Sequence, residues 1–276
     1  MAKTLKRIYA GAIQWDVLCD RPTGRENPIQ RQAKRQASSE AQRVLNQKNS
    51  WQKLEQLLST NFPTPGSALW ACLPFDDAHM PKNRKEAQRR IKYFLKMLRD
   101  ARKAFGLTDP VVFWSIEVLT SASGRWHVHV VIDNTGSDYD MIRDCWIYGR
   151  DVEIRKAGIP GKGDEPSAWY DPNADEPGNF WKAIAKYMTK EPRECQEYDA
   201  KPGLHGWSCT RNVKRPEVET FIVPDDFKLE APEGSIVMLD VRKKTEWASY
   251  HVIKYRFSGA GYAAAPRAKR RKKRRR

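Results

Sequence analysis

The chain has 276 residues, of which 40% are hydrophobic and 30% charged, a composition typical of a soluble globular protein with one large domain or two small ones. Its formal net charge of +16 favours a polyanionic partner, most commonly nucleic acid. The sequence has no apolar run of the roughly 18 residues that a membrane span needs, no segment resembling a signal peptide and no C-x-x-C pair, so we expect no membrane partner, no disulfide framework and a reducing compartment.

The first part of the chain predicts an N-terminal helical extension over residues 1–62. Residues 28–58 are polar, and Pro28 stands where a helix can begin. Apolar residues recur at helical spacing in the second half of this segment: Val44, Leu45, Trp51, Leu54, Leu57 and Leu58. The Pro- and Gly-rich residues 62–66 then break the chain, and we expect a second domain over residues 63–225.

The second domain begins with a strand and a long helix. Residues 67–73 predict a short buried strand. Asn83, with Glu86 three residues later, is a capping signal for a helix that Gly106 ends. One face of this helix is apolar: Ile91, Phe94, Leu95, Leu98 and Phe105. The opposite face is basic and could meet solvent, the default, or DNA: Arg89, Arg90, Lys92, Lys96, Arg99, Arg102 and Lys103.

The remaining elements continue the mixture of helices and strands. We expect, in chain order, a hairpin over 111–132, a helix from Ser137 or Asp138 to about Ile147, a strand over 151–156, a loop over 158–178, a helix over 179–191, and a C-terminal hairpin of 235–241 and 249–257 within a region 226–260. This order predicts an α+β fold with a central antiparallel sheet of about five strands, flanked by helices.

Residues 261–276 predict a basic, disordered tail. Residues 267–276 hold nine Lys and Arg, and subtracting these nine charges from +16 leaves +7 for residues 1–266. The body of the chain is therefore basic as well. Such a run serves as a solvated tail, a membrane-surface contact, a nuclear localisation signal or a phosphate-binding arm, and we favour the last of these.

His127 and His129 stand out because the chain has only five histidines. In a strand, alternate side chains point to the same face, so both imidazoles would share one face while Val128 and its apolar neighbours share the other. If the turn of the hairpin is centred in the connecting loop, Glu117 lies opposite His127 and joins the histidine face. Two imidazoles and a carboxylate form a mixed site that suits Mn, Mg, Zn or Fe. The alternative is a pair of ordinary strand histidines.

The helix over 179–191 carries the second group of candidate residues. Its apolar stripe consists of Phe180, Trp181, Ile184 and Met188. Tyr187 lies at the edge of that stripe, and Lys190 follows one helical turn later. Lys182 and Lys186 form a basic ridge with Lys190 beside the tyrosine. The alternative is an amphipathic helix with an edge tyrosine and solvated lysines.

A strand with His-hydrophobe-His, followed by Tyr-x-x-Lys on a later helix, resembles the HUH endonucleases, and within them the rolling-circle replication initiators of small phages and plasmids. The resemblance covers roughly residues 67–220 and implies an HUH-like nuclease fold for the domain over 63–225. Residues 69–77 stand where these proteins have a first strand, here without its frequent threonines. Residues 206–216 are similar to a downstream basic segment of the phage-type members.

This resemblance also implies the roles of individual residues. Tyr187 would attack the DNA backbone and become linked to a 5′ phosphate, while Lys190 would stabilise charge or position the phosphate. A divalent ion, Mg or Mn, would be held by His127, His129 and Glu117. Four basic residues would contact the nucleic acid: Lys186, Arg211, Lys214 and Arg215.

The implied function is metal-dependent, site-specific nicking and strand transfer on single-stranded DNA, which initiates rolling-circle replication at origin DNA. Because the sequence has no helicase motif, a host helicase and a polymerase would take part. The protein would act in the cytoplasm of a prokaryotic host, or in the nucleus if the host is eukaryotic. The alternatives are a single-tyrosine transposase or relaxase with the same chemistry, and a non-catalytic nucleic-acid-binding protein.

Overall fold

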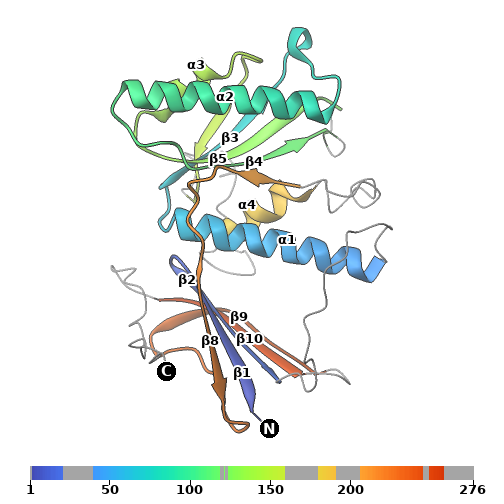
Figure 1. The fold of residues 1–276 in the computed structure, drawn as a ribbon, viewed down its shortest axis with the longest axis vertical. Helices are drawn as coiled ribbons and strands as arrows, with labels where there is room; N and C mark the ends of the chain where they lie inside the picture. The colour runs from blue at the N-terminus through green and yellow to red at the C-terminus, as the bar shows by residue number, and fades with distance from the viewer. Residues whose placement is uncertain are drawn as a thin grey trace, which may run out of the picture. The chain divides into compact units, whose positions relative to one another are not determined.

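The computed structural model describes residues 2–20, 40–118, 121, 124–158, 180–190, 206–244 and 249–257 (Figure 1). The chain forms two compact units, one of residues 1–26 with 215–276 and the other of residues 27–214. The described part holds two five-stranded antiparallel sheets and four α-helices, which confirms the predicted α+β class with a sheet flanked by helices. No helix in these described ranges is long and apolar enough to span a bilayer.

The sheet of the unit 27–214 has the strand order β6-β3-β5-β4-β7. Its strands are β3 (Ala68–Pro74), β4 (Val112–Glu117), β5 (His127–Asp133), β6 (Glu153–Lys156) and β7 (Ser208–Cys209). β4 and β5 form the predicted hairpin, and β3 and β6 match the predicted strands at 67–73 and 151–156. The pairing of β3 with β5 brings together segments that are far apart in the sequence.

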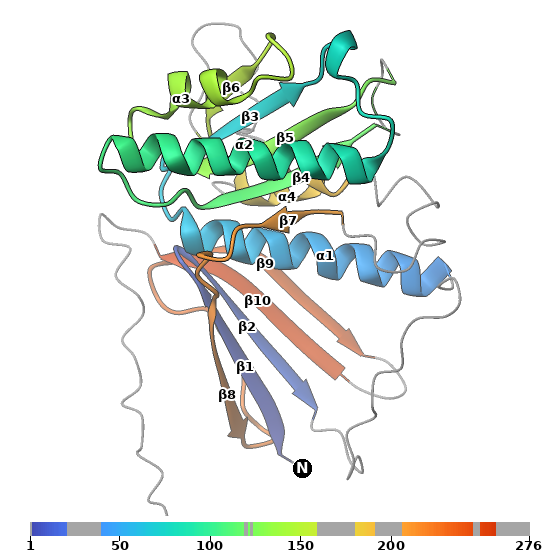
Figure 2. The same cartoon turned by 45° about the horizontal axis from the view of Figure 1, so that its top comes forward.

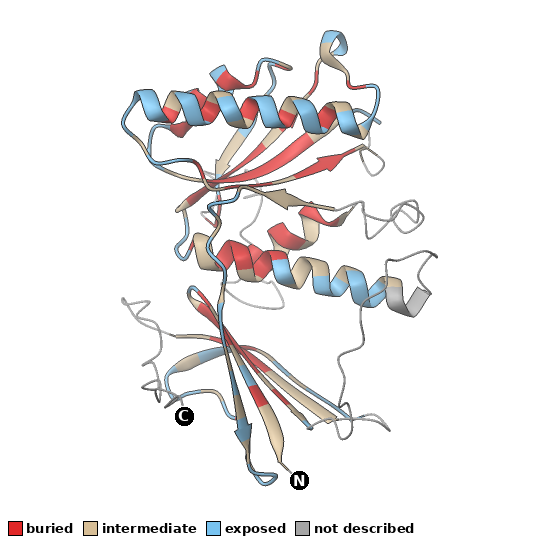
Figure 3. Cartoon of the chain, in the orientation of Figure 1, coloured by how far each residue is buried: buried red, intermediate tan, exposed pale blue. Residues whose placement is uncertain are grey.

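Two helices cover each face of this sheet (Figures 1 and 2). α2 (Arg84–Ala104) and α3 (Asp138–Cys145) cover one face, and α1 (Glu40–Asn61) and α4 (Phe180–Met188) cover the other. Successive strand residues point to opposite faces, so Val130 packs toward α2 and Val131 toward α1 and α4. Both faces of the central strands are therefore buried, as the red strands of Figure 3 show.

The long helix α2 begins as predicted but differs from its predicted pattern at two positions. The Asn83 side chain accepts a hydrogen bond from the Glu86 amide at 3.0 Å, which caps the helix. Phe105 was placed in the apolar stripe and is 72% exposed, because the helix has already ended at Ala104. Arg102 was placed on the basic face and is fully buried, because it is paired with two carboxylates from outside the helix.

The other unit is built on the sheet β8-β1-β2-β10-β9. Its strands are β1 (Lys3–Ala10), β2 (Ile13–Asp20), β8 (Glu217–Val223), β9 (Ser235–Lys244) and β10 (Ser249–Phe257). β9 and β10 pair as the predicted C-terminal hairpin. The first two strands turn at Gly11, whose φ of 61° favours glycine, and β2 then pairs with β10.

The division into units differs from the predicted domains at 1–62, 63–225 and 226–260. Residues 3–20 of the predicted helical extension are strands, while α1 packs into the core of the unit 27–214. β8, predicted within the nuclease domain, pairs with β1 in the other unit. The physical reason is that antiparallel pairing joined segments from both ends of the chain, which no local pattern reveals. Three predicted features lie outside the described residues: the start of the helix at 28–58, nearly all of the loop at 158–178, and the tail at 261–276.

Candidate metal and tyrosine site

The β4–β5 hairpin brings the predicted metal ligands together. Glu117 pairs with His127 and Ser115 pairs with His129, which confirms the predicted register. The two histidines and Glu117 therefore share the sheet face that α1 and α4 cover, while Val128 packs in the core on the other face. A register slip of one residue would have placed Glu117 on the opposite face.

Glu117 is the centre of this group of side chains. Its Oε2 lies 2.7 Å from His129 Nε2 and 3.2 Å from His127 Nε2, and its Oε1 lies 2.6 Å from Lys190 Nζ. Glu117 and His129 are only 3% and 2% exposed. The carboxylate thus has two strand histidines on one oxygen and a cation from the α4 end on the other.

Burial and hydrogen bonding shift the pKa values of these groups in opposite directions. Burial by itself raises the pKa of Glu117, but hydrogen bonds from His127, His129 and Lys190 outweigh it and hold that pKa far below its ordinary range. Burial lowers the pKa of His129, against the opposing effect of Glu117. Burial also opposes the charged form of Lys190, yet its contact with Glu117 raises the pKa of the amine. The site therefore holds an ionised carboxylate, a neutral His129 and a protonated lysine at neutral pH.

Both histidines direct Nε2 toward the same carboxylate oxygen, Glu117 Oε2. His127 Nδ1 lies 3.1 Å from the carbonyl oxygen of Arg125, and this contact orients the ring. The other ring nitrogen, His127 Nε2, then faces Glu117 Oε2 at 3.2 Å. In an octahedral site, metal–ligand bonds of about 2.1 Å separate adjacent donor atoms by roughly 3.0 Å, which lies between the two Nε2–Oε2 distances of 2.7 and 3.2 Å. The three donor atoms therefore lie close together on one face of the sheet.

Cys72 joins this group and was not among the predicted ligands. It lies opposite His129 on β3, and its Sγ forms a possible metal-binding triad with His127 and His129, all ligand atoms lying within 4.8 Å of one another. Burial, with smaller effects from two glutamates, raises the pKa of the thiol to about 12, so it is protonated at neutral pH. The sequence predicts the strand that contains Cys72, but no local pattern predicts that this strand pairs with β5, so its position beside His129 could not be foreseen.

Tyr187 lies against the histidine face. Its ring centroid is 4.9 Å from that of His129, and Lys190 Nζ lies 4.2 Å from the centre of the tyrosine ring. Trp70 also stacks on His129: their ring centroids are 5.4 Å apart, and the angle between the ring planes is 21°. Burial raises the pKa of the Tyr187 phenol, and Lys190 opposes this effect. Trp181 and Met188 anchor α4 in the core, which leaves Tyr187 half-buried at its edge as predicted.

The four predicted nucleic-acid contacts have different neighbours in the structure. Lys186 Nζ lies 5.5 Å from the ring centre of Trp51 on α1. Arg211 lines a cavity beside α2. This cavity lies on the face of the sheet opposite to Tyr187. The backbone amide of Lys214 donates to Asn61 at the end of α1. The fourth residue, Arg215, is exposed at the start of the other unit.

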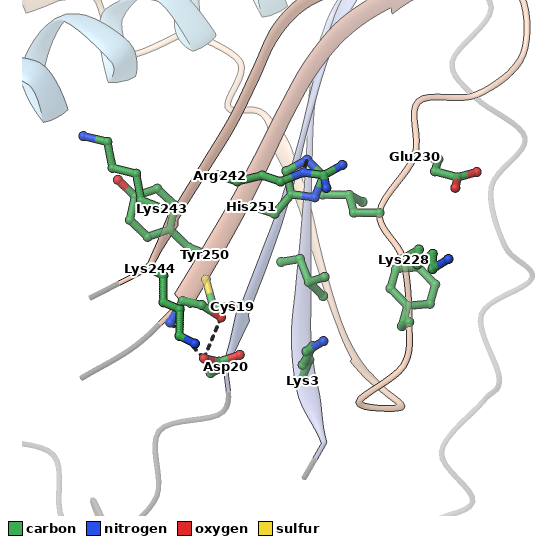
Figure 4. Close-up of a pocket in the computed structure, with 14 residues that line it drawn as sticks. Lys3, Cys19, Asp20, Lys228, Glu230, Arg242, Lys243, Lys244, Tyr250 and His251 are labelled. Atoms are coloured by element: carbon green, nitrogen blue, oxygen red, sulfur yellow. Dashed lines mark hydrogen bonds between the residues drawn. The ribbon is translucent and has the colours of Figure 1, made fainter. Parts of the chain in front are cut away.

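The other unit has a cavity of its own, of about 540 Å³, at the open ends of β1, β2, β9 and β10 (Figure 4). Basic side chains dominate its lining: Lys3, Lys228, Arg242, Lys243 and Lys244. Lys3 bonds the backbone carbonyl of Asp225 and lies 4.0 Å from its carboxylate. Arg242 Nε lies 3.3 Å from His251 Nε2, which in turn lies 2.7 Å from an Asp240 oxygen. Two of these basic side chains, Lys3 and Arg242, therefore already have partners within the unit.

Comparisons with models of protein families, with curated proteins and with solved structures find no match for this chain. The function must therefore be inferred from the geometry of its own side chains.

Proposed function

We propose that the unit 27–214 is a metal-dependent, site-specific nicking and strand-transfer enzyme for single-stranded DNA, which initiates rolling-circle replication. One observation carries the proposal. Tyr187 packs on His129, and Lys190 connects the same helix to Glu117, the carboxylate that also faces both strand histidines. A phenol, a cation and a mixed nitrogen–oxygen ligand set within one group of contacts are the parts that a tyrosine nuclease needs.

His127, His129 and Glu117 would hold a divalent ion, for which we propose Mg or Mn. When bound, such an ion supplies Lewis-acid stabilisation of the charge that develops on the scissile phosphate. Because the pKa of Glu117 is far below its ordinary range, this ligand is ionised at any physiological pH. The contact of His127 Nδ1 with the Arg125 carbonyl orients the ring so that Nε2 faces the carboxylate.

Tyr187 would be the nucleophile. Its Oη forms a bond to phosphorus while the bond from phosphorus to the 3′ oxygen breaks, so the 5′ phosphate becomes linked to the tyrosine. The phenol proton passes to water, and the departing 3′ oxygen takes up a proton to become a free hydroxyl. Lys190 stays protonated beside the ring and balances charge on the phosphate oxygens.

The covalent linkage also accounts for strand transfer without ATP. A free 3′ hydroxyl can attack the phosphotyrosine, which reforms a phosphodiester and releases Tyr187 as a phenol. The free 3′ end left by nicking is a primer for a polymerase, and unwinding is left to a host helicase. A single-tyrosine transposase or relaxase would use the same steps on a different DNA, so the chemistry and the biological role need separate tests.

A non-catalytic nucleic-acid-binding protein is the second candidate, and one contact favours it. Lys190 reaches Glu117 Oε1 at 2.6 Å while both histidines lie near Oε2, so the carboxylate has partners even without a metal. On this alternative Tyr187 is a packing residue at the edge of α4. Because DNA binding is then the whole function, the Tyr187→Phe variant keeps it.

A cleavage assay on labelled, single-stranded circular DNA with an origin insert tests the proposal. We expect a DNA–protein band on a denaturing gel that requires Mg²⁺ or Mn²⁺ and is absent for Tyr187→Phe. Tyr93→Phe is the control, because Tyr93 is 47% exposed on α2, across the sheet from the site. If no covalent band forms with any of a set of origin inserts while DNA binding persists, the binding protein is the better interpretation. A band that survives in Tyr187→Phe would reject Tyr187 as the nucleophile.

A further inference from the structure

A second hollow in the unit 27–214 lies away from the tyrosine. This cavity of about 540 Å³ is lined by α2 on one side and by the segment 209–212, at and after β7, on the other. Trp114 of β4 also lines it, and this side chain packs on the α2 face of the sheet. Tyr187 packs on the opposite face, so the cavity is separate from the candidate metal site.

The cavity is strongly basic. Lys92, Lys96 and Arg99 lie at positions i, i+4 and i+7 of α2, which places them in one stripe over about 10 Å of helix axis. Arg211 faces them from the segment after β7. Against these four cations the lining holds one carboxylate, that of Asp109.

The four cations are also available to a ligand. All four are exposed, and none makes an ion pair with any residue in the described ranges. This distinguishes them from Arg102 on the same helix, which is fully buried between two aspartates. Concentrated positive charge without internal partners is costly to keep together unless an anion neutralises it.

Trp114 indicates which kind of anion fits the cavity. Its side chain is partly exposed among the lining residues, so an aromatic surface accompanies the row of cations. Cations that track phosphates beside an aromatic ring that accepts a base are the parts of a single-strand binding groove. The bases of a duplex are stacked within the helix and cannot reach such a ring, so the cavity fits an unpaired strand better than a duplex.

We propose that this cavity, the α2 groove, binds single-stranded nucleic acid, with phosphates on Lys92, Lys96, Arg99 and Arg211 and a base on Trp114. The groove lies across the sheet from Tyr187 and requires neither the tyrosine nor a metal. It would hold a stretch of strand that is not being cleaved. Its role therefore goes beyond the proposed nicking reaction and can be tested independently of it.

The test compares two triple variants of the full chain. The groove triple reverses the charge of three lining residues: Lys92→Glu, Lys96→Glu and Arg99→Glu. The control triple makes the same charge change on exposed residues of α2 and α3 outside the lining: Lys85→Glu, Arg89→Glu and Arg143→Glu. The probe is a fluorescently labelled 20-nucleotide oligothymidine in a chelating buffer, so no cleavage takes place. We expect the groove triple to lose about tenfold or more in affinity.

Salt dependence gives a second readout. Each lost contact to a single-strand phosphate lowers the slope of log affinity against log salt by about 0.7, so three lost contacts lower it by about 2. The control triple should keep most of the slope. Trp114→Leu should weaken binding about fivefold or more without changing the slope, because it removes stacking and no charge.

Several results would overturn the proposal. Equal losses in both triples would mean that binding follows overall charge and not the groove. A larger loss in Lys228→Glu, Arg242→Glu and Lys244→Glu would place the strand in the cavity of the other unit (Figure 4). Tighter binding of duplex than of oligothymidine would reject the single-strand assignment, whereas equal binding of single-stranded RNA and DNA would support it. Failure of the tyrosine to form a covalent product leaves these binding results unchanged.

Discussion

Glu117→Gln tests both the buried charge and the metal site with one change of atom. The substitution keeps the shape of the side chain but removes the negative charge from a residue that is 3% exposed and faces His127, His129 and Lys190. A charge-assisted hydrogen bond is worth about 1.5–3 kcal/mol, and breaking a buried ion pair costs about 3–5 kcal/mol. Lys190 is 19% exposed and can turn toward water, so we expect a cost that overlaps both ranges and stays below the upper limit of the second.

We therefore expect the free energy of unfolding to fall by about 2–4 kcal/mol in a chelating buffer. In a unit of this size, 1 kcal/mol corresponds to about 2–4 °C, so the melting temperature should fall by roughly 4–16 °C. Mn²⁺ at a hundred times its dissociation constant should stabilise the wild-type protein by about 2.7 kcal/mol and leave the variant unchanged.

Glu153→Gln is the matched control. Glu153 lies on β6 with its side chain 46% exposed, so the same substitution there should change stability by no more than about 0.5 kcal/mol. Thermal melts followed by circular dichroism, with chelator and then with Mn²⁺, give both quantities. If Glu117→Gln melts together with Glu153→Gln and still gains stability from Mn²⁺, the carboxylate is neither a structural charge nor a metal ligand.

Three further predictions concern metal choice, stability and pH. Cys72→Ser should weaken Zn²⁺ or Cd²⁺ binding, measured by calorimetry, and leave Mn²⁺ binding unchanged, because a thiol with a pKa near 12 is deprotonated only by a soft metal; equal losses for both metals would contradict this. Arg102→Met should lower the unfolding free energy in urea by about 3–5 kcal/mol, since it leaves the buried Asp138 and its neighbour Asp133 without their cation; a loss under about 1 kcal/mol would show that the pair is dispensable. Because burial lowers the pKa of His129, the unfolded state takes up a proton below about pH 6.5 that the folded state does not, so stability should fall by up to about 1.4 kcal/mol per pH unit as the pH drops from 6.5; urea unfolding at pH 7, 6 and 5 in a chelating buffer, with His129→Gln as control, would refute this if the profile is flat.

The hairpin at β4 and β5 could be predicted because its two strands are neighbours in the sequence. A short turn determines the register of such a pair, and the alternating apolar residues determine which face is buried. Together these predicted that Glu117 lies opposite His127, as the structure has it. The capping residue Asn83 was predictable for the same reason, since its partner is three residues away.

Contacts between distant segments could not be predicted in this way. Cys72 and Trp70 reach His129 only because β3 pairs with β5, and the sequence of β3 does not state its partner. The pairing of β1 with β8 joins the two ends of the chain for the same reason. Arg102 looked like a surface residue because its two carboxylates come from elsewhere in the chain, and charge alone does not distinguish a solvated arginine from a buried, paired one.

Glu117 connects two parts of the site that rest on different elements. The histidines are held by a strand buried on both faces, whereas Tyr187 belongs to the short helix α4 and Lys190 follows two residues after its end. The carboxylate reaches both through polar contacts, with one oxygen toward the histidines and the other toward the lysine. A substitution at His127 should therefore act on the metal and on Glu117 Oε2, while one at Glu117 should also act on the placement of the tyrosine through Lys190. The two effects can be separated because the ion pair between Lys190 and Glu117 needs no metal, so a displacement of the tyrosine in Glu117→Gln persists when metal is in excess.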